Sequence, residues 1–174
     1  MDEAVLLEKI RQNANQALRT FVADRHEQAL RVAFRYLRNW EAAADCVQDA
    51  FLKVAEQLGR KPPPQNFSAW FFRILVNRCL DELRSARRRQ NTPLESQGEL
   101  PVQGFEEGVH AKLTAQVLLA QLKPSLRSVL ILHDLEGFSF GELAQILGRS
   151  ESAVRGLLFR ARKKLAKQFA ELQK

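Results

Sequence analysis

The sequence predicts an all-α protein made of two small helical domains joined by a flexible acidic linker, with a helix-turn-helix in the second domain. Helix-forming residues dominate, while Gly (8) and Pro (6) are few. Apolar residues recur at helical spacing over most of the chain. The pattern stops after residue 89, where NTPLESQGELPVQG is polar, acidic and interrupted by Pro and Gly. We therefore expect domains at 1–89 and 111–174, with a linker at 90–110.

In the first domain, periodicity predicts helices near 3–20, 24–38, 41–58 and 67–88. The segment PPPQN at 62–66 lies between the last two and cannot be the interior of a helix, because proline lacks an amide donor and clashes with the preceding turn. We expect it to form a stiff loop. Asn66 or Ser68 is placed to cap the helix that follows.

The predicted helix at 41–58 has two different faces. One is an apolar stripe that we expect to be buried: Val47, Phe51, Val54 and Leu58. The other is acidic and polar with one leucine among the charges: Asp45, Gln48, Asp49, Leu52 and Glu56. An acidic face with one apolar anchor suits docking against a basic protein helix. The alternative is an ordinary solvated face with one exposed leucine.

The predicted helix at 67–88 begins with aromatic residues, Trp70, Phe71 and Phe72, and carries a polar row that continues with Arg73, Asn77, Asp81, Arg84 and Arg88. Aromatic rings beside arginines favour binding of unstacked bases, since rings stack on bases and arginines contact phosphates. The alternative is that the aromatic residues belong to the hydrophobic core.

In the second domain we expect helices near 105–121, 124–135, 139–147 and 150–170, with Pro124 at a first helical position. Ser139 and Glu142 have the spacing of a capping box. Gly148 is placed to end the helix in a left-handed conformation. Ser150 is placed to cap the next helix. Two capped helices separated by a tight turn predict a helix-turn-helix.

The last helix has an apolar stripe for packing and an opposite face that is strongly basic. Such a face suits the major groove, where arginine can donate twice to guanine and other cations meet phosphates. The alternatives are a solvated structural helix or a basic helix that binds membranes. The candidate duplex-reading residues are Ser150, Ser152, Arg155, Gly156, Phe159, Arg160 and Lys163.

Charge and composition narrow the possible functions. The formal net charge is +7, and residues 149–174 hold eight Arg or Lys against two Glu, which is compatible with a polyanionic partner. His26, His110 and His133 are scattered, and we find no metal-ligand spacing, phosphate-binding glycine loop or nucleophile motif. We expect no catalytic activity, no cofactor and no small-molecule substrate. No signal peptide or membrane-spanning stretch is evident, so we expect a cytoplasmic protein whose Cys46 and Cys79 are buried and reduced.

Taken together, these segments resemble a bacterial RNA polymerase sigma factor of the extracytoplasmic-function class. The resemblance rests on D-x-x-Q-D-x-F at 45–51, F-x-A-W-F-F-R-I at 67–74 and the basic helix of LKPSLRSVLILHDLEGFSFGELAQILGRSESAVRGLLFRARKKL. It covers roughly 24–88 and 113–168 in the family's order. Two departures stand out: the short KPPPQN loop before Phe67, and the small residues Ala153 and Gly156 in the basic helix.

The resemblance implies a transcription initiation factor that binds core RNA polymerase and directs it to promoters. Its core-binding residues would be Asp45, Gln48, Asp49 and Leu52. Residues that read and melt the −10 element would be Asn66, Trp70, Arg73, Asn77, Arg84 and Arg88. The basic helix would read duplex DNA at −35, and residues 91–110 would thread towards the RNA exit path. An anti-sigma factor is commonly wedged between the two domains.

Other functions remain open from the residues alone. A stand-alone helix-turn-helix regulator would bind duplex DNA without polymerase, so charge reversal at Asp45 and Asp49 would leave it unaffected. An RNA-binding antiterminator would prefer structured RNA to promoter DNA. The promoter sequence and the inducing signal are not written in the chain.

Overall fold

A computed structural model of the chain describes residues 4–5, 8, 14–58, 60, 62–90 and 117–172. These residues form helices connected by turns and contain no strand, which confirms the all-α prediction. The predicted linker at 91–110 and the first part of the helix expected at 105–121 lie outside the described residues. The elements, in chain order, are α2 (Ala14–Leu37), α3 (Trp40–Leu58), α4 (Phe67–Gln90), α6 (Pro124–Val129), η1 (Leu130–Leu135), α7 (Phe140–Leu147) and α8 (Glu151–Leu172).

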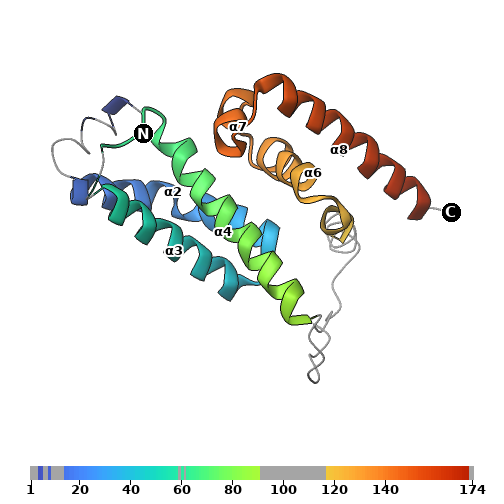
Figure 1. Ribbon diagram of the computed structural model, residues 1–174, viewed down its shortest axis with the longest axis horizontal. Coiled ribbons are helices and arrows are strands. Elements are labelled where there is room, and N and C mark those ends of the chain that lie inside the picture. The colour runs from blue at the N-terminus through green and yellow to red at the C-terminus, as the bar shows by residue number, and fades with distance from the viewer. Residues whose placement is uncertain are drawn as a thin grey trace.

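Helices α2, α3 and α4 pack against one another as an N-terminal bundle (Figure 1). Its core is rich in aromatic rings. The Phe21 ring meets the rings of Phe67 and Phe71 edge-on, at 4.8 and 5.2 Å between centroids. Phe51 stacks on Phe71 at 4.5 Å. This cluster fixes α4 against α2 and α3 at its first two turns, because edge-to-face and offset contacts hold rings in defined orientations.

The predicted break between helices 3–20 and 24–38 was wrong, since α2 runs without interruption from Ala14 to Leu37. No Gly or Pro occurs in that range. The polar residues at 24 and 26–27 lie on the exposed side of the helix, while Ala17, Phe21 and Ala29 continue its buried side. A charged patch on the solvent face of a helix does not end it.

Helices α6, η1, α7 and α8 form a C-terminal unit (Figure 1). The helix predicted at 124–135 is α-helical only to Val129, and its second half, η1, is a π-helix. The capping box is present as predicted: the Ser139 hydroxyl accepts from the Glu142 amide, and the Glu142 carboxylate accepts from the Ser139 amide. Gly148 adopts φ +62°, the left-handed conformation predicted for the end of α7. Ser150 accepts from the Ala153 amide and caps α8.

The N-terminal bundle and the C-terminal unit pack directly on each other, so one buried core runs through both. The main contact joins α4 to α7, and α2 contacts η1. Figure 1 shows α4 lying between α3 and the C-terminal unit, with α8 on the far side of that unit. No helix among the described residues is long and apolar enough to span a bilayer.

Candidate nucleic-acid and protein interfaces

The basic face of α8 is open to solvent. All seven candidate duplex-reading residues, from Ser150 to Lys163, are exposed, and the Phe159 side chain is 70% exposed. The apolar stripe of the same helix is buried: Val154, Leu157, Leu158 and Ala161. Packing therefore turns the cationic face outward, as a helix that enters a DNA groove requires. The arrangement excludes a fold in which this polar face is internal.

Arg155 is held in place by the helix before it. Its guanidinium carbon lies 3.9 Å from the centroid of the Phe140 ring, at the start of α7. Glu151 lies one turn earlier on α8 and approaches the same guanidinium at 3.8 Å. Stacking occupies the face of a guanidinium but leaves its N–H groups, which lie in the plane, free to donate. Arg155 is thus pre-oriented with its donors available.

The polar row of α4 starts at the cap of the helix. The Asn66 side-chain oxygen accepts from the Ala69 amide at 2.9 Å, so Asn66 is the N-cap, and any contact with a base would use its NH2 group. Trp70 is half-buried against the Phe67 ring, with centroids 5.4 Å apart. Phe71 and Phe72 are fully buried, so these two rings belong to the core.

Arg73, Asn77 and Arg84 continue this row, and the structure brings them to a groove between α4 and the C-terminal unit. The groove has a volume of about 280 Å³, and its opposite wall includes Pro124, Leu147 and Arg149. Arg88 is exposed near the end of α4 and lies beyond this groove. All three side chains are exposed. The sequence indicated that they share a helix face, but not that the C-terminal unit forms the other wall of a groove beside that face.

The acidic face of α3 is exposed as predicted. Asp45, Gln48, Asp49 and Glu56 are open to solvent, and the Leu52 side chain is 61% exposed. Val47 and Val54 on the opposite face are buried, while Phe51 and Leu58 are half-buried. Leu52 and Gln48 border a shallow hollow of about 450 Å³, which Leu18 and His26 of α2 complete. The sequence pattern did not indicate that these two α2 residues lie beside α3.

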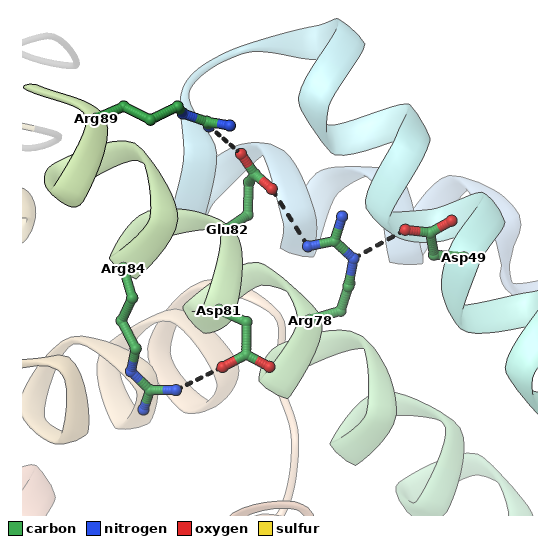
Figure 2. Close-up of polar contacts among 6 residues, drawn as sticks. All are labelled: Asp49, Arg78, Asp81, Glu82, Arg84 and Arg89. Carbon is green, nitrogen blue, oxygen red and sulfur yellow. Dashed lines mark hydrogen bonds and ion pairs between the residues drawn. The ribbon is translucent and has the colours of Figure 1, made fainter.

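Asp49 belongs to an ion-pair chain that the sequence analysis missed (Figure 2). Arg78 of α4 donates to the Asp49 carboxylate at 2.8 Å and to Glu82 at 3.3 Å, and Arg89 donates to Glu82 at 2.6 Å. The hydrogen bond to Asp49 raises the pKa of Arg78. The hydrogen bond from Arg89, together with that from Arg78, lowers the pKa of Glu82. Only the four-residue spacing of Arg78 and Glu82 was visible in the sequence.

Comparison with known proteins decides the family. The sequence matches Sigma-70 region 2 over residues 10–89 and Sigma-70 region 4 over residues 113–165. It is 34% identical over 142 residues to the ECF RNA polymerase sigma factor SigM of Mycobacterium tuberculosis, covering 82% of this chain and 71% of SigM. The chain belongs to the extracytoplasmic-function sigma factors.

Solved structures agree with this assignment. CnrH in complex with the cytosolic domain of CnrY superposes with a TM-score of 0.72 at 26% identity, covering 96% of each chain. The sigma factor RpoE, in complex with the anti-sigma factor NepR from Bartonella quintana, gives a TM-score of 0.62 at 26% identity, covering 87% of this chain and 97% of RpoE. The first likeness extends over both helical units.

As a sigma factor, the protein is a transcription initiation factor that directs core RNA polymerase to promoters. The stand-alone regulator considered from the sequence is therefore the wrong alternative. In a sigma factor the DNA-binding helix-turn-helix belongs to a protein that also binds the polymerase. Sigma factors as a class are initiation factors rather than catalysts.

The two cysteines of the sigma factor are buried and unbridged, Cys46 in α3 and Cys79 in α4. A hydrogen bond with Cys46 and burial raise the pKa of the Cys79 thiol, while the same hydrogen bond lowers the pKa of Cys46. Within the described ranges, no three His, Cys, Asp or Glu side chains gather as a metal site would require. Both thiols lie in the buried core and hydrogen-bond to each other.

Proposed function

We propose that the sigma factor divides its work among three surfaces. The acidic face of α3 docks on core polymerase through Asp45, Gln48, Asp49 and Leu52. The polar row of α4 captures melted −10 bases, and the outer face of α8 reads the −35 duplex. The two functional modules correspond to 1–89 and 111–174, joined by 90–110. The observation that carries the proposal is that all three surfaces are built on rigid helices with their apolar sides packed inward.

Docking on polymerase is supported by the combination of charge and an apolar anchor on α3. The 61% exposed Leu52 stands beside a shallow hollow, and the neighbouring carboxylates would steer a basic partner helix towards it. Because Asp49 is paired with Arg78, its carboxylate is fixed in position, whereas Asp45 forms no ion pair among the described residues. Substitutions at Asp45 and Leu52 should therefore test polymerase binding without disturbing the packing of the N-terminal bundle.

Promoter opening in this scheme is driven by binding. Bases that leave the stack are captured by α4, where Trp70 offers a partly exposed ring and Arg73, Arg84 and Arg88 offer positive charge. Simultaneous engagement of −35 by α8 raises the effective concentration of α4 at −10. The chain itself has no catalytic role, requires no cofactor or small-molecule substrate, and works in the cytoplasm with core polymerase. An anti-sigma factor is the expected inhibitor, by analogy with the NepR complex.

The test measures binding of core polymerase by Asp45→Lys and Leu52→Asp variants. Loss of a central apolar anchor costs more than about 1 kcal/mol, and charge reversal at a rim slows association, so we expect at least about tenfold weaker binding by the double variant. Glu171→Lys, which makes the same charge change on α8, is the control. Unchanged polymerase binding by the double variant, with its helix content intact, would remove α3 from the proposal.

A further inference from the structure

We propose that the cleft between α4 and the C-terminal unit binds a small organic phosphate of the nucleoside diphosphate class, with two phosphate groups and an aromatic base. This ligand is distinct from the polymerase and the promoter that the three surfaces above are assigned to bind. The proposal rests on arginines that enter the cleft from both helical units, on a buried arginine without a counter-ion, and on an apolar floor beside them.

The cleft consists of two adjoining hollows on the side of α4 that faces the C-terminal unit (Figure 1). The larger is the groove of about 280 Å³, and the smaller, of about 30 Å³, lies further along α4. Leu80, Arg84 and Pro124 line both hollows, so the two are continuous. Their combined space is near the lower end of the range for pockets that hold small ligands.

Positive charge enters the cleft from both units without matching negative charge. Arg73 and Arg84 come from α4, and Arg149 comes from the turn between α7 and α8. A Cβ placed on Gly148 would lie 3.5 Å from the Arg73 guanidinium, so Arg73 reaches the turn that carries Arg149. None of the described residues that line either hollow is acidic. An anion with several oxygens that binds here replaces repulsion between like charges with charge-assisted hydrogen bonds.

These arginines differ in how far they are already paired. Arg84 donates to Asp81 at 2.5 Å on the outer surface of α4 (Figure 2). Arg73 and Arg149 form no ion pair among the described residues and are exposed. Their guanidinium groups are therefore available to a ligand without the loss of an existing ion pair.

Arg127 adds a buried charge to the smaller hollow. It lines this hollow and is only 6% exposed. Its Nη2 donates to the backbone oxygens of Arg35 and Tyr36 at 2.9 and 2.6 Å, but its buried Nε has no hydrogen-bond partner. Carbonyl oxygens satisfy a donor but carry no net charge, and a buried charge is normally paired. The positive charge of Arg127 therefore remains uncompensated.

No carboxylate of the described residues neutralises Arg127. Glu136, the buried carboxylate of the same interface, is already shared by Arg35 and Arg31, at 2.6 and 3.5 Å. Burial lowers the pKa of Arg127, and the nearby charge of Arg87 acts in the same direction. Arg87 also lines the smaller hollow and forms no ion pair among the described residues. A phosphate at the mouth of this hollow supplies the missing counter-ion.

The floor of the larger groove is apolar and suits the organic part of the ligand. Its side chains come from α4, α7 and α8 and are buried or half-buried: Val76, Leu80, Ile146, Leu147 and Leu157. Small-ligand sites typically combine such a lining with a few polar groups that fix orientation, and Asn77 and Ser125 provide these here. A base that rests on this floor keeps its phosphates among the arginines at the rim.

A bound ligand contacts both helical units and occupies Arg73 and Arg84. Both arginines also belong to the polar row that we assign to the −10 strand, so the ligand and a single strand compete for them. Arg87 and Arg149 belong neither to that row nor to the α8 residues assigned to −35. Substitutions at these two positions therefore test the ligand site separately from the proposed function.

The test measures binding of adenosine and guanosine diphosphate to the full chain by isothermal titration calorimetry, with guanosine and inorganic pyrophosphate as comparison ligands. The variants are Arg87→Gln and Arg149→Gln. The matched control is Arg19→Gln, which removes the same charge from an exposed site on α2. The melting temperature with and without ligand gives a second readout, because a ligand that binds only the folded protein stabilises it.

We expect at least one of the two diphosphates to bind wild type and Arg19→Gln equally and to raise the melting temperature of both. Arg87→Gln and Arg149→Gln should each bind it about tenfold more weakly, because each loses a hydrogen-bonded charge pair with a phosphate. Guanosine should not bind, since it has no phosphate. Pyrophosphate should bind more weakly than the diphosphate, because it has no base to cover the apolar floor.

Three results would overturn the inference. Neither diphosphate binds wild type at millimolar concentration. Arg19→Gln weakens binding as much as the cleft variants, which would mean that the ligand responds only to overall charge. A short single-stranded DNA depends on Arg87 and Arg149 while the diphosphates do not bind, which would assign the cleft to nucleic acid. In each case the tests of polymerase binding by α3 and of duplex binding by α8 remain independent.

Discussion

The stacking of Arg155 on Phe140 predicts that an α7 residue outside the DNA-facing surface controls the affinity of the sigma factor for duplex DNA. The perturbation is Phe140→Leu, which keeps an apolar side chain at this half-buried position but removes the ring. The guanidinium is 3.9 Å from that ring, and the Arg155 side chain is 60% exposed. At such exposure a cation–π contact contributes about 0.5–1 kcal/mol.

Without the ring, this energy no longer orders the Arg155 side chain before binding. The free energy of duplex binding then becomes less favourable by the same amount. At about 1.4 kcal/mol per factor of ten, we expect Phe140→Leu to weaken duplex binding about 2–5-fold. The assay is fluorescence anisotropy with a labelled duplex carrying a promoter that the factor uses, in wild-type and Arg155→Ala backgrounds. If Phe140 acts through Arg155, Phe140→Leu should have little further effect on duplex binding in the Arg155→Ala background.

Two results would refute this reasoning. Equal weakening by Phe140→Leu in both backgrounds would mean that the ring acts through the fold of α7. Tighter binding by Phe140→Leu would mean that the stack holds Arg155 away from DNA rather than presenting it. Helix content and melting temperature of each variant show whether the helix-turn-helix is intact.

Further predictions concern stability. Gly148→Ala should destabilise the protein by about 1 kcal/mol in urea unfolding, because the φ of Gly148 is +62°. Gly156→Ala should stabilise it by a similar amount, because Gly156 lies inside α8 with open space around its Cβ position. Equal effects of the two substitutions would refute the left-handed conformation of Gly148. Asn66→Ala should cost about 1 kcal/mol through loss of the cap to Ala69, and Asn66→Asp should retain most of it. Glu82→Gln should flatten the acid limb of the stability profile: the lowered pKa of Glu82 means that its stabilisation is complete above the unfolded pKa of about 4.3 and is lost as pH falls through the folded value. An unchanged acid limb in urea unfolding would contradict this.

The features that local chemistry determines were predictable from the sequence. The Ser139 and Glu142 capping box, the left-handed Gly148 and the Ser150 cap all follow from short-range hydrogen bonding, and the structure contains each of them. The outward basic face of α8 follows in the same way from helical periodicity. For these elements the prediction and the structure agree because each feature depends on residues that are close together in the chain.

Other features depend on contacts between distant segments. Arg127 and Glu136 look like ordinary charged residues in the sequence, and only packing on α2 buries them. The continuity of α2 was also missed, because the single buried side that runs from Ala17 through Phe21 to Ala29 is defined by packing on the neighbouring helices. Arg78 likewise finds Asp49 29 residues away, across two helices. The groove beside Arg73, Asn77 and Arg84 could not be predicted without the arrangement of the two units.

The most direct test of the account is transcription in vitro with purified core polymerase and a library of randomised promoters. The account predicts selected start sites preceded by two separated blocks of sequence preference. The Asp45→Lys and Leu52→Asp double variant should need at least about tenfold more factor to produce them. Start sites that do not depend on adding the factor, or that show a single block of preference, would contradict it.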